Sequence, residues 1–244
     1  MERKNIERHK SIIYTSFRFR IISAVVYNSV IMVIRLLFPY LFGHEVIGRD
    51  NLRDIDGGIA VSNHCTYLDP GFIAKALHGR KIYFSIQEQT IDVKGLGYFL
   101  RCLHGFPLPE DRPMDIAASV RTLIRENALV HFFPEGVLYD YNQEIMDFQA
   151  GSFYFALKND VPIIPVTTVL KERSILGKTL QPPWVKIITV IGPAIEIKLE
   201  PDAAADARSI AAEYAEAVRK TMQNVIDNEG GDKKLFTGKI DHKV

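Results

Sequence analysis

The sequence has few of the residues that mark disulfide-stabilised or metal-binding proteins. Its 244 residues include only 2 cysteines, Cys65 and Cys102, which excludes a disulfide framework and makes a reducing compartment the expected one. It contains no Cys/His cluster with zinc spacing, no P-loop, no dinucleotide fingerprint and no internal repeat. Its formal net charge is only +1, so the molecule as a whole has no preference for nucleic acid. We therefore predict no metal, no bound cofactor and no nucleic-acid partner.

One long apolar run, Ile21–Phe42, lies near the N-terminus. It is long enough to cross a bilayer core of about 30 Å. Asn28, Arg35 and Pro39 interrupt it, however, and an arginine deep in the core costs about 2.5–3.5 kcal/mol on insertion scales. Basic residues precede the run and aromatic residues end it, namely Arg3, Lys4, Arg8, Lys10, Arg18 and Arg20, then Phe38, Tyr40 and Phe42.

These features predict a helix that lies in the headgroup region of a membrane, on its cytoplasmic face. If the run crossed once with its basic end inside, the domain that follows would lie outside the cytoplasm. No small-residue cleavage site follows the run, so it is not interpreted as a signal peptide. The alternative is a buried helix of a soluble core.

Beyond this run, short apolar strands alternate with helical segments. Strands are predicted over residues 45–48, 57–61, 81–86, 128–133, 161–166 and 185–191, and helices over 70–77, 95–103, 112–126, 151–159 and 203–228. This alternation predicts an α/β fold with a mostly parallel or mixed central sheet flanked by helices. Residues 1–43 would form the membrane-associated helical element, 44–230 one α/β domain, and 231–244 a loose C-terminal tail.

The stretch Val61–Pro70 lies where an apolar strand meets a helix, the usual place for chemistry in an α/β sheet. On a straight helix, five positions turn a side chain by roughly 500°, so His64 and Asp69 would not share a face. Asp69 precedes Pro70, which favours a helix that starts at the proline with the aspartate as its cap. The turn before it can then fold the imidazole over the carboxylate, as a general base requires. An isolated pair of this kind is more often a helix cap and an unrelated loop histidine.

Two later segments change this interpretation. Phe133-Pro134-Glu135-Gly136 follows an apolar strand, and Val161-Pro162-Ile163-Ile164-Pro165-Val166 leads into another. Together with Asn63-His64-x4-Asp69-Pro70, and in this order, they resemble the glycerolipid acyltransferase family of the PlsC type, which includes the 1-acylglycerol-3-phosphate acyltransferases. The resemblance covers about residues 46–192.

The resemblance implies a reaction and a role for each block. His64 would be the general base that removes a proton from the hydroxyl of a lysophosphatidate-like glycerolipid, and Asp69 would orient it. The hydroxyl would attack the thioester of acyl-CoA or acyl carrier protein directly, and donors near the start of the following helix would stabilise the oxyanion. Glu135 and Gly136 would belong to the acceptor-binding block, and Pro165 would lie near the acyl-donor or lipid side.

Two blocks depart from the family pattern. The family has a glycine, apolar residues and an arginine that binds the acceptor phosphate; the best match here is the longer Gly105–Arg112, with two extra acids. Arg112 is the candidate phosphate ligand, because a guanidinium suits phosphate geometry; Arg101 is the alternative, and a surface arginine at a helix start is the competing interpretation. Val137-Leu138 occupies the place where Thr-Arg often follows the glycine, which leaves a different lyso-lipid acceptor open.

The same residues allow other interpretations. A catalytically silent lipid-binding or membrane-adaptor protein would keep the fold; the altered blocks favour it and the intact His64 and Asp69 oppose it. Cys65 is a poor thiol nucleophile, because adjacent residues point apart and its paired base normally comes from elsewhere in the chain. His131 and Glu135 near the pair would suggest a metal hydrolase, but no HExxH-like helix supports one.

Overall fold

The computed structural model describes residues 13–14, 16–199 and 206–241. A seven-stranded sheet forms its centre, in the order β1-β10-β7-β2-β5-β3-β4. The strands are β1 (Glu45–Ile47), β2 (Gly58–Ser62), β3 (Ile82–Gln87), β4 (Gly105–Leu108), β5 (Leu129–Phe132), β7 (Ile163–Lys171) and β10 (Lys186–Ile191). The β10–β7 pair is antiparallel and the other five pairs are parallel. The prediction of a mixed α/β sheet is confirmed.

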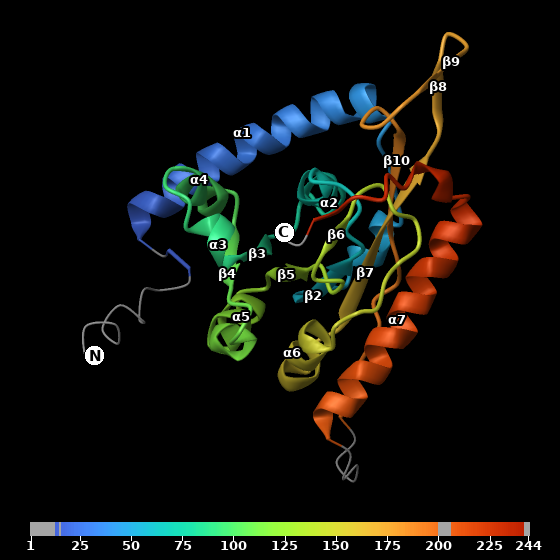
Figure 1. The fold of residues 1–244 in the computed structure, drawn as a ribbon. Coiled ribbons are helices and arrows are strands. Elements are labelled where there is room, and N and C mark those ends of the chain that lie inside the picture. Colours follow the sequence, from blue (N-terminus) through green and yellow to red (C-terminus); the bar gives the residue numbers. More distant parts are fainter. Residues whose placement is uncertain (1–12, 15, 200–205, 242–244) are drawn as a thin grey trace.

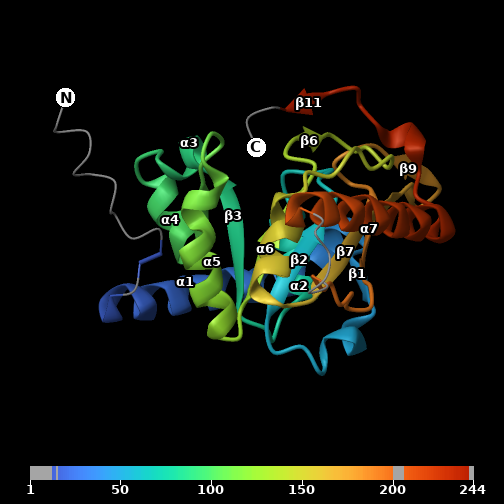
Figure 2. The same cartoon turned by 90° about the horizontal axis from the view of Figure 1, so that it is seen from below.

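Helices cover both faces of this sheet (Figures 1 and 2). One apolar cluster packs beneath α5 (Ala117–Arg125), α6 (Gly151–Asn159) and α7 (Ala207–Glu229). Another lies on the opposite face, beneath α1 (Phe17–Phe42) and α2 (Asp69–Ala76). Successive side chains of β2 point to opposite faces of the sheet, which explains this division. Ile59 and Val61 belong to the first cluster and Ala60 to the second. The short helices α3 (Glu88–Ile91) and α4 (Leu96–Cys102) lie between β3 and β4 in the chain.

The long N-terminal helix lies across the surface of the domain beside α4 and α2 (Figure 1). It starts earlier than predicted, at Phe17, where the side chain of Ser16 caps it. Near its end, the rings of Phe38 and Phe42 pack against Phe72 with centroids 4.6 and 5.2 Å away. By length and composition it is the one helix in the described residues that could cross a membrane.

The C-terminal end is more ordered than predicted. After α7, Lys233–Leu235 forms the short 3₁₀ helix η4, and β11 (Ile240–Asp241) pairs antiparallel with β6 (Leu138–Tyr139). The prediction of a loose tail from residue 231 is therefore wrong up to residue 241, because backbone pairing with a distant strand holds it. Residues 242–244 of that tail, and 203–205 of the predicted last helix, lie outside the described residues.

The remaining described elements lie in connections. They are the 3₁₀ helices η2 (Arg49–Leu52) and η3 (Pro113–Ile116) and the hairpin of β8 (Arg173–Ile175) and β9 (Lys178–Leu180). The η3 segment and α5 together account for the single helix predicted over 112–126. The edge strand β4 was not predicted.

Candidate active site

The candidate active site lies where the carboxyl ends of β2 and β5 meet. These strands are parallel neighbours, with Val61 level with Phe132, so the turns that follow them project from the same edge of the sheet. The turn after β2 carries His64 and Asp69, and the turn after β5 carries Glu135. This topology brings together residues that are 71 positions apart in the sequence.

The predicted histidine–aspartate contact is present. His64 Nδ1 lies 2.9 Å from Asp69 Oδ2, and the two residues are only 3% and 0% exposed. Because a carboxylate only accepts, Nδ1 carries the hydrogen and Nε2 has the free lone pair. Nε2 is buried and has no hydrogen-bond partner among the described residues. The ring of Phe133 stacks on the imidazole, with centroids 3.9 Å apart.

The aspartate is held from several sides. Its Oδ2 also accepts from the backbone amides of Cys65 (2.7 Å) and Thr66 (2.9 Å), and its Oδ1 accepts from Thr66 Oγ1 (2.8 Å). Leu68 N donates to the same threonine hydroxyl at 3.2 Å. These bonds fold the turn over residues 65–68 around the carboxylate. Asp69 is the first residue of α2, with Leu68 in the N-cap position, so it is not the cap as predicted.

Most backbone amides near the start of this helix, where oxyanion donors were predicted, are already bonded. The backbone amides of Gly71 and Phe72 donate to the carbonyl of Leu68 at 2.9 and 3.2 Å. The amide of His64 and the two amides after it are bonded to buried carboxylates. These bonds hold the aspartate and the turn that follows β5, and the stabilisation of an oxyanion by donors near the start of α2 stays a prediction.

Glu135 supports the loop that carries the histidine. It is 7% exposed, and its Oε1 accepts from the amide of His64 (2.8 Å) while Oε2 accepts from the amide of Met146 (3.0 Å). Burial raises the pKa of this carboxyl to about 8, although both amide bonds act to lower it. The next residue, Gly136, has φ +69°, and a Cβ there would lie 2.5 Å from the Gln149 amide nitrogen. The Glu-Gly pair therefore suits a tight turn packed on two loops.

Asn63 and Pro165 join the loop to the neighbouring strand β7. The Asn63 side chain donates to the Thr168 carbonyl (3.0 Å) and accepts from the Thr168 amide (2.8 Å). Asn63 belongs to the predicted motif, but the sequence indicated no role for it. Pro165 is buried in β7, level with Val61, and its carbonyl accepts from Gly192 N at 2.9 Å.

Arg112 is not brought into contact with the histidine. It follows β4, and its guanidinium lies 3.4 Å from the Asp115 carboxylate with about half of the side chain exposed. Because β4 is three strands away from β2, the lateral separation between these two strands is roughly 14 Å. The alternative, Arg101, stacks over the ring of Tyr14 at 4.7 Å and lines a different cavity.

The cysteine and metal alternatives find little support in this geometry. Cys65 Sγ lies 3.8 Å from Asp69 Oδ1, and burial together with that carboxylate raises the pKa of the thiol well above its usual range, whereas a nucleophilic thiol needs a lowered one. Burial lowers the pKa of His131 to about 3, and its Nε2 is 2.8 Å from Ser62 Oγ. No three His, Cys, Asp or Glu side chains of the described residues are grouped so that they could hold a metal ion.

The fold and the site define the class: an α/β protein with a buried histidine–aspartate pair at the end of a strand. Comparisons with known proteins identify the family. The sequence profile of the acyltransferase family matches residues 43–169, just over half of the chain. The chain therefore belongs to the acyltransferase family, of the PlsC type, as the sequence predicted.

Individual relatives agree with this assignment. Human 1-acyl-sn-glycerol-3-phosphate acyltransferase beta is 29% identical over 135 residues, which cover 53% of this chain and 48% of that protein. The 1-acyl-sn-glycerol-3-phosphate acyltransferase of Bacillus subtilis (strain 168) is 23% identical over 126 residues, or 50% of this chain and 61% of the relative. The chain thus matches about half the length of these relatives. The crystal structure of the 1-acyl-sn-glycerophosphate acyltransferase PlsC from Thermotoga maritima shares the fold, with a TM-score of 0.58 and 18% identity over 83% of this chain and 80% of that one.

Proposed function

We propose that this protein is a membrane-associated O-acyltransferase of glycerophospholipid synthesis. It transfers a fatty acyl group from the thioester of acyl-CoA or acyl carrier protein to the free hydroxyl of a lysophosphatidate-like glycerolipid. The observation that carries this proposal is the geometry of His64, whose Nδ1 is bonded to a fully buried aspartate while Nε2 has no described partner. The names of the relatives support the acceptor class.

In the proposed reaction, His64 acts as general base. Nε2 takes the proton of the glycerolipid hydroxyl as its oxygen attacks the thioester carbon. The new C–O bond forms, the C–S bond breaks, and the proton passes from Nε2 to the departing sulfur, which leaves as a thiol. Asp69 keeps the imidazole in the required tautomer and stabilises the imidazolium. Because Nε2 is buried, side chains above the ring have to move before the hydroxyl can reach it.

We assign the remaining predicted residues to supporting and substrate-binding roles. Glu135 positions the histidine loop through its amide bond, and Gly136 forms the exposed turn beside it. Arg112, exposed at the same edge of the sheet, binds the acceptor phosphate, and Pro165 lies on the acyl side. The arginine that often follows the Glu-Gly turn is replaced by Leu138, which is fully buried in β6, so this position supplies no cation. The missing cation favours a lyso-lipid other than a phosphomonoester as the second candidate acceptor.

The arrangement of α1 supports a helix that lies in the membrane surface. It contacts α4 through Ser23, whose hydroxyl donates to the Cys102 carbonyl (2.8 Å), and α2 through Phe38. A helix packed against its own domain along much of its length is poorly placed to cross a bilayer at the same time. Its outer side chains, including Val25, Met32 and Leu36, are 57–63% exposed. We therefore infer peripheral binding, on the cytoplasmic face.

The assay that tests the catalytic proposal measures free-thiol release from acyl-CoA, and acyl transfer from acyl carrier protein, with a panel of lyso-lipids. His64→Ala and Asp69→Asn should each lower kcat by about a thousandfold or more, as loss of a general base or its orienting acid does. The matched controls His78→Ala and Asp50→Asn, which change the same residue types away from the site, should keep activity. Full activity in His64→Ala would overturn the mechanism. A wild-type protein that acylates no lyso-lipid would instead indicate the silent lipid-binding alternative.

A further inference from the structure

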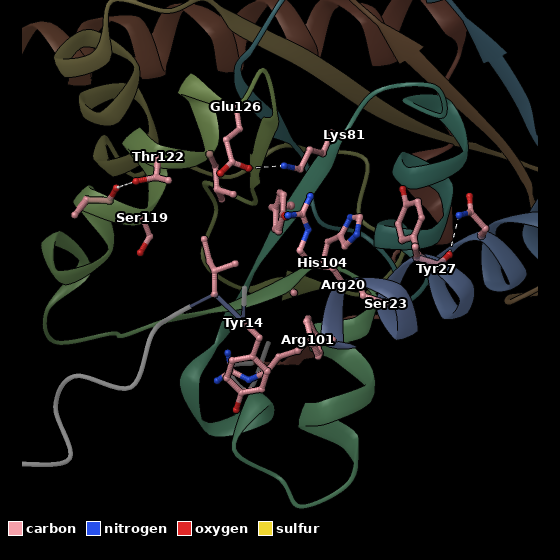
Figure 3. A pocket seen from close by; sticks show the side chains of 18 residues that line it. Tyr14, Arg20, Ser23, Tyr27, Lys81, Arg101, His104, Ser119, Thr122 and Glu126 are labelled. Atoms are coloured by element: carbon pink, nitrogen blue, oxygen red, sulfur yellow. Dashed lines mark hydrogen bonds and ion pairs between the residues drawn. The ribbon is translucent and has the colours of Figure 1, made fainter. Parts of the chain in front are cut away.

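A second cavity lies far from the histidine, between α1, the edge of the sheet and α5. Its volume is about 660 Å³, within the range of small-molecule sites. Figure 3 shows the side chains around it. Among them are Arg20 and Tyr27 of α1, Lys81 just before β3, Ser119 of α5, and Glu126 just after α5.

This cavity is separate from the proposed active site. Lys81 precedes β3, and its carbonyl accepts from the amide of Leu129 at the amino end of β5 (2.8 Å). His64 follows the opposite, carboxyl end of β2, two strands further along the parallel part of the sheet. Strand spacing and rise place the two sites on the order of 15 Å apart. The cavity therefore needs a ligand of its own.

The charges in the cavity select an anion. Three cationic side chains line it, those of Arg20, Lys81 and Arg101, against the single carboxylate of Glu126. Lys81 Nζ lies 2.6 Å from Glu126 Oε2, a contact drawn in Figure 3. Arg20 makes no ion pair with any described residue. A concave site with an excess of two positive charges, one of them an uncommitted guanidinium, suits a phosphate group.

The wall beside Arg20 is aromatic and uncharged. The ring of His104 is stacked between Tyr27 and Tyr83, with centroid distances of 4.4 and 4.9 Å. Its Nδ1 lies 3.0 Å from the Ile82 carbonyl, and burial lowers the pKa of the imidazole. Figure 3 shows this ring beside the guanidinium of Arg20. The ligand therefore has an apolar part next to its anionic group.

The position of α1 indicates that such a ligand would come from a membrane surface. Arg20 and Tyr27 point into the cavity, while Ile21, Ile22 and Val25 on the same turns are 50%, 44% and 63% exposed. The cavity thus opens beside a helix whose outer face is apolar and suited to a membrane surface. An amphiphile in that surface can place its head group in the cavity while its chains stay with the bilayer.

We propose that this cavity binds the phosphate head group of an anionic membrane phospholipid. Arg20 is its main phosphate ligand, Lys81 and Arg101 add positive charge, and the Tyr27–His104–Tyr83 stack contacts the glycerol backbone. The site goes beyond acyl transfer: its lipid is bound and not acylated, and it holds α1 and the β3–α5 edge together at the membrane.

The test titrates the full-length protein in neutral detergent with dioctanoyl phosphatidylglycerol and counts bound lipids by native mass spectrometry. The proposal expects one lipid per chain, with dioctanoyl phosphatidylcholine and inorganic phosphate binding at least tenfold more weakly. Arg20→Ala should weaken binding at least tenfold. Arg18→Ala changes an exposed arginine of the same helix that does not line the cavity, and it should have no effect.

A steric variant tests the same cavity without changing its charge. Ser119→Trp should fill the cavity and abolish binding, whereas Ala212→Trp, at an exposed position of α7, should not. Equal losses in Arg18→Ala and Arg20→Ala, undiminished binding in Ser119→Trp, or inorganic phosphate that binds as tightly as the lipid would each overturn the proposal. No acyl donor is present, so the outcome does not depend on whether the protein transfers acyl groups.

Discussion

At the scale of single residues, Asp69 is the group that holds the candidate site together. A fully buried carboxylate is costly unless donors surround it, and here it accepts from the His64 ring, two backbone amides and the Thr66 hydroxyl. The sequence predicted the contact with His64, because Pro70 restricts the aspartate that precedes it. It did not predict the bond that the His64 amide donates to Glu135, because that bond depends on two strands becoming neighbours.

The buried Glu135 makes stability depend on pH. Its pKa rises from 4.5 to about 8 on folding, so between these values the folded protein holds a proton that the unfolded chain releases. This contribution to stability is fully present below about pH 4.5 and is lost as pH rises through about 8, at up to about 1.4 kcal/mol per pH unit. The glutamine variant Glu135→Gln does not titrate, but it leaves one backbone amide without an acceptor, which costs about 1–3 kcal/mol.

Wild type should therefore melt above Glu135→Gln at pH 5, and this difference should shrink steadily as pH rises and change sign before pH 8.5. The measurement is the midpoint of thermal unfolding of both proteins in matched buffers across that range. Other groups, such as the buried His131, titrate in both proteins and cancel in the difference. Glu213→Gln, an exposed glutamate of α7, is the control and should show no such trend. A difference that stays constant with pH would contradict the raised pKa.

At the scale of elements, the sequence predicted the helices and strands that have a recognisable local pattern. It missed the strands that form only because a distant segment pairs with them. The helix over residues 151–159 has the predicted bounds, because its apolar spacing and Asn-Asp end are local signals. Strands β6 and β11 contain only two residues each, too few for any alternation to be recognised. They exist because the chain end returns to pair with a segment about 100 positions earlier.

The C-terminal strap, residues 236–241, is linked to the histidine loop through β6. On one side, the amides of Tyr139 and Tyr141 donate to the carbonyls of His64 and Cys65 (3.2 and 2.7 Å). On the other side, β6 pairs with β11, and the hydroxyl of Tyr67 in the histidine loop contacts the Asp241 carboxylate. Removing the strap should therefore loosen β6 and, through it, the loop.

Deletion of residues 236–244 should speed amide hydrogen exchange in residues 138–141 by at least about tenfold, since several backbone bonds that protect this segment are lost. Hydrogen-exchange mass spectrometry measures this, with α7 as the internal reference that should not change. Tyr67→Phe removes only the hydroxyl contacts to Asp241 and Lys239 and should have a smaller effect. Unchanged protection of residues 138–141 after the deletion would show that the strap does not hold this segment.

At the scale of the whole molecule, strand–helix alternation predicted the class of fold but not the strand order. The antiparallel pairing of β10 with β7 depends on how the connection between them turns, which no local pattern reports. The second cavity was also beyond prediction, because its walls come from α1, the start of β3 and α5, which are separated by about a hundred residues and meet only in the folded chain.

The packing of α1 on the rest of the molecule determines how its membrane binding can be tested. Deleting the helix would expose Phe72, which is fully buried against Phe38 and Phe42, and loss of binding would then be confused with loss of folding. The double variant Val25→Glu/Leu36→Glu avoids this, because these side chains are 63% and 57% exposed and do not belong to the buried core. Each loses about 1.5–3 kcal/mol of apolar transfer to the membrane, so binding should fall by at least about tenfold while the melting temperature stays the same.

Flotation with neutral phosphatidylcholine vesicles measures this effect without a contribution from anionic lipid. The control is Leu176→Glu, which places the same charge at a leucine that is 99% exposed in the β8–β9 turn, outside α1. It should bind vesicles as wild type does, because an exposed leucine outside the membrane-facing surface contributes no transfer energy. If the double variant floats as well as wild type, the outer face of α1 is not the membrane-binding surface. If Leu176→Glu fails to float, the contact surface includes the β8–β9 hairpin.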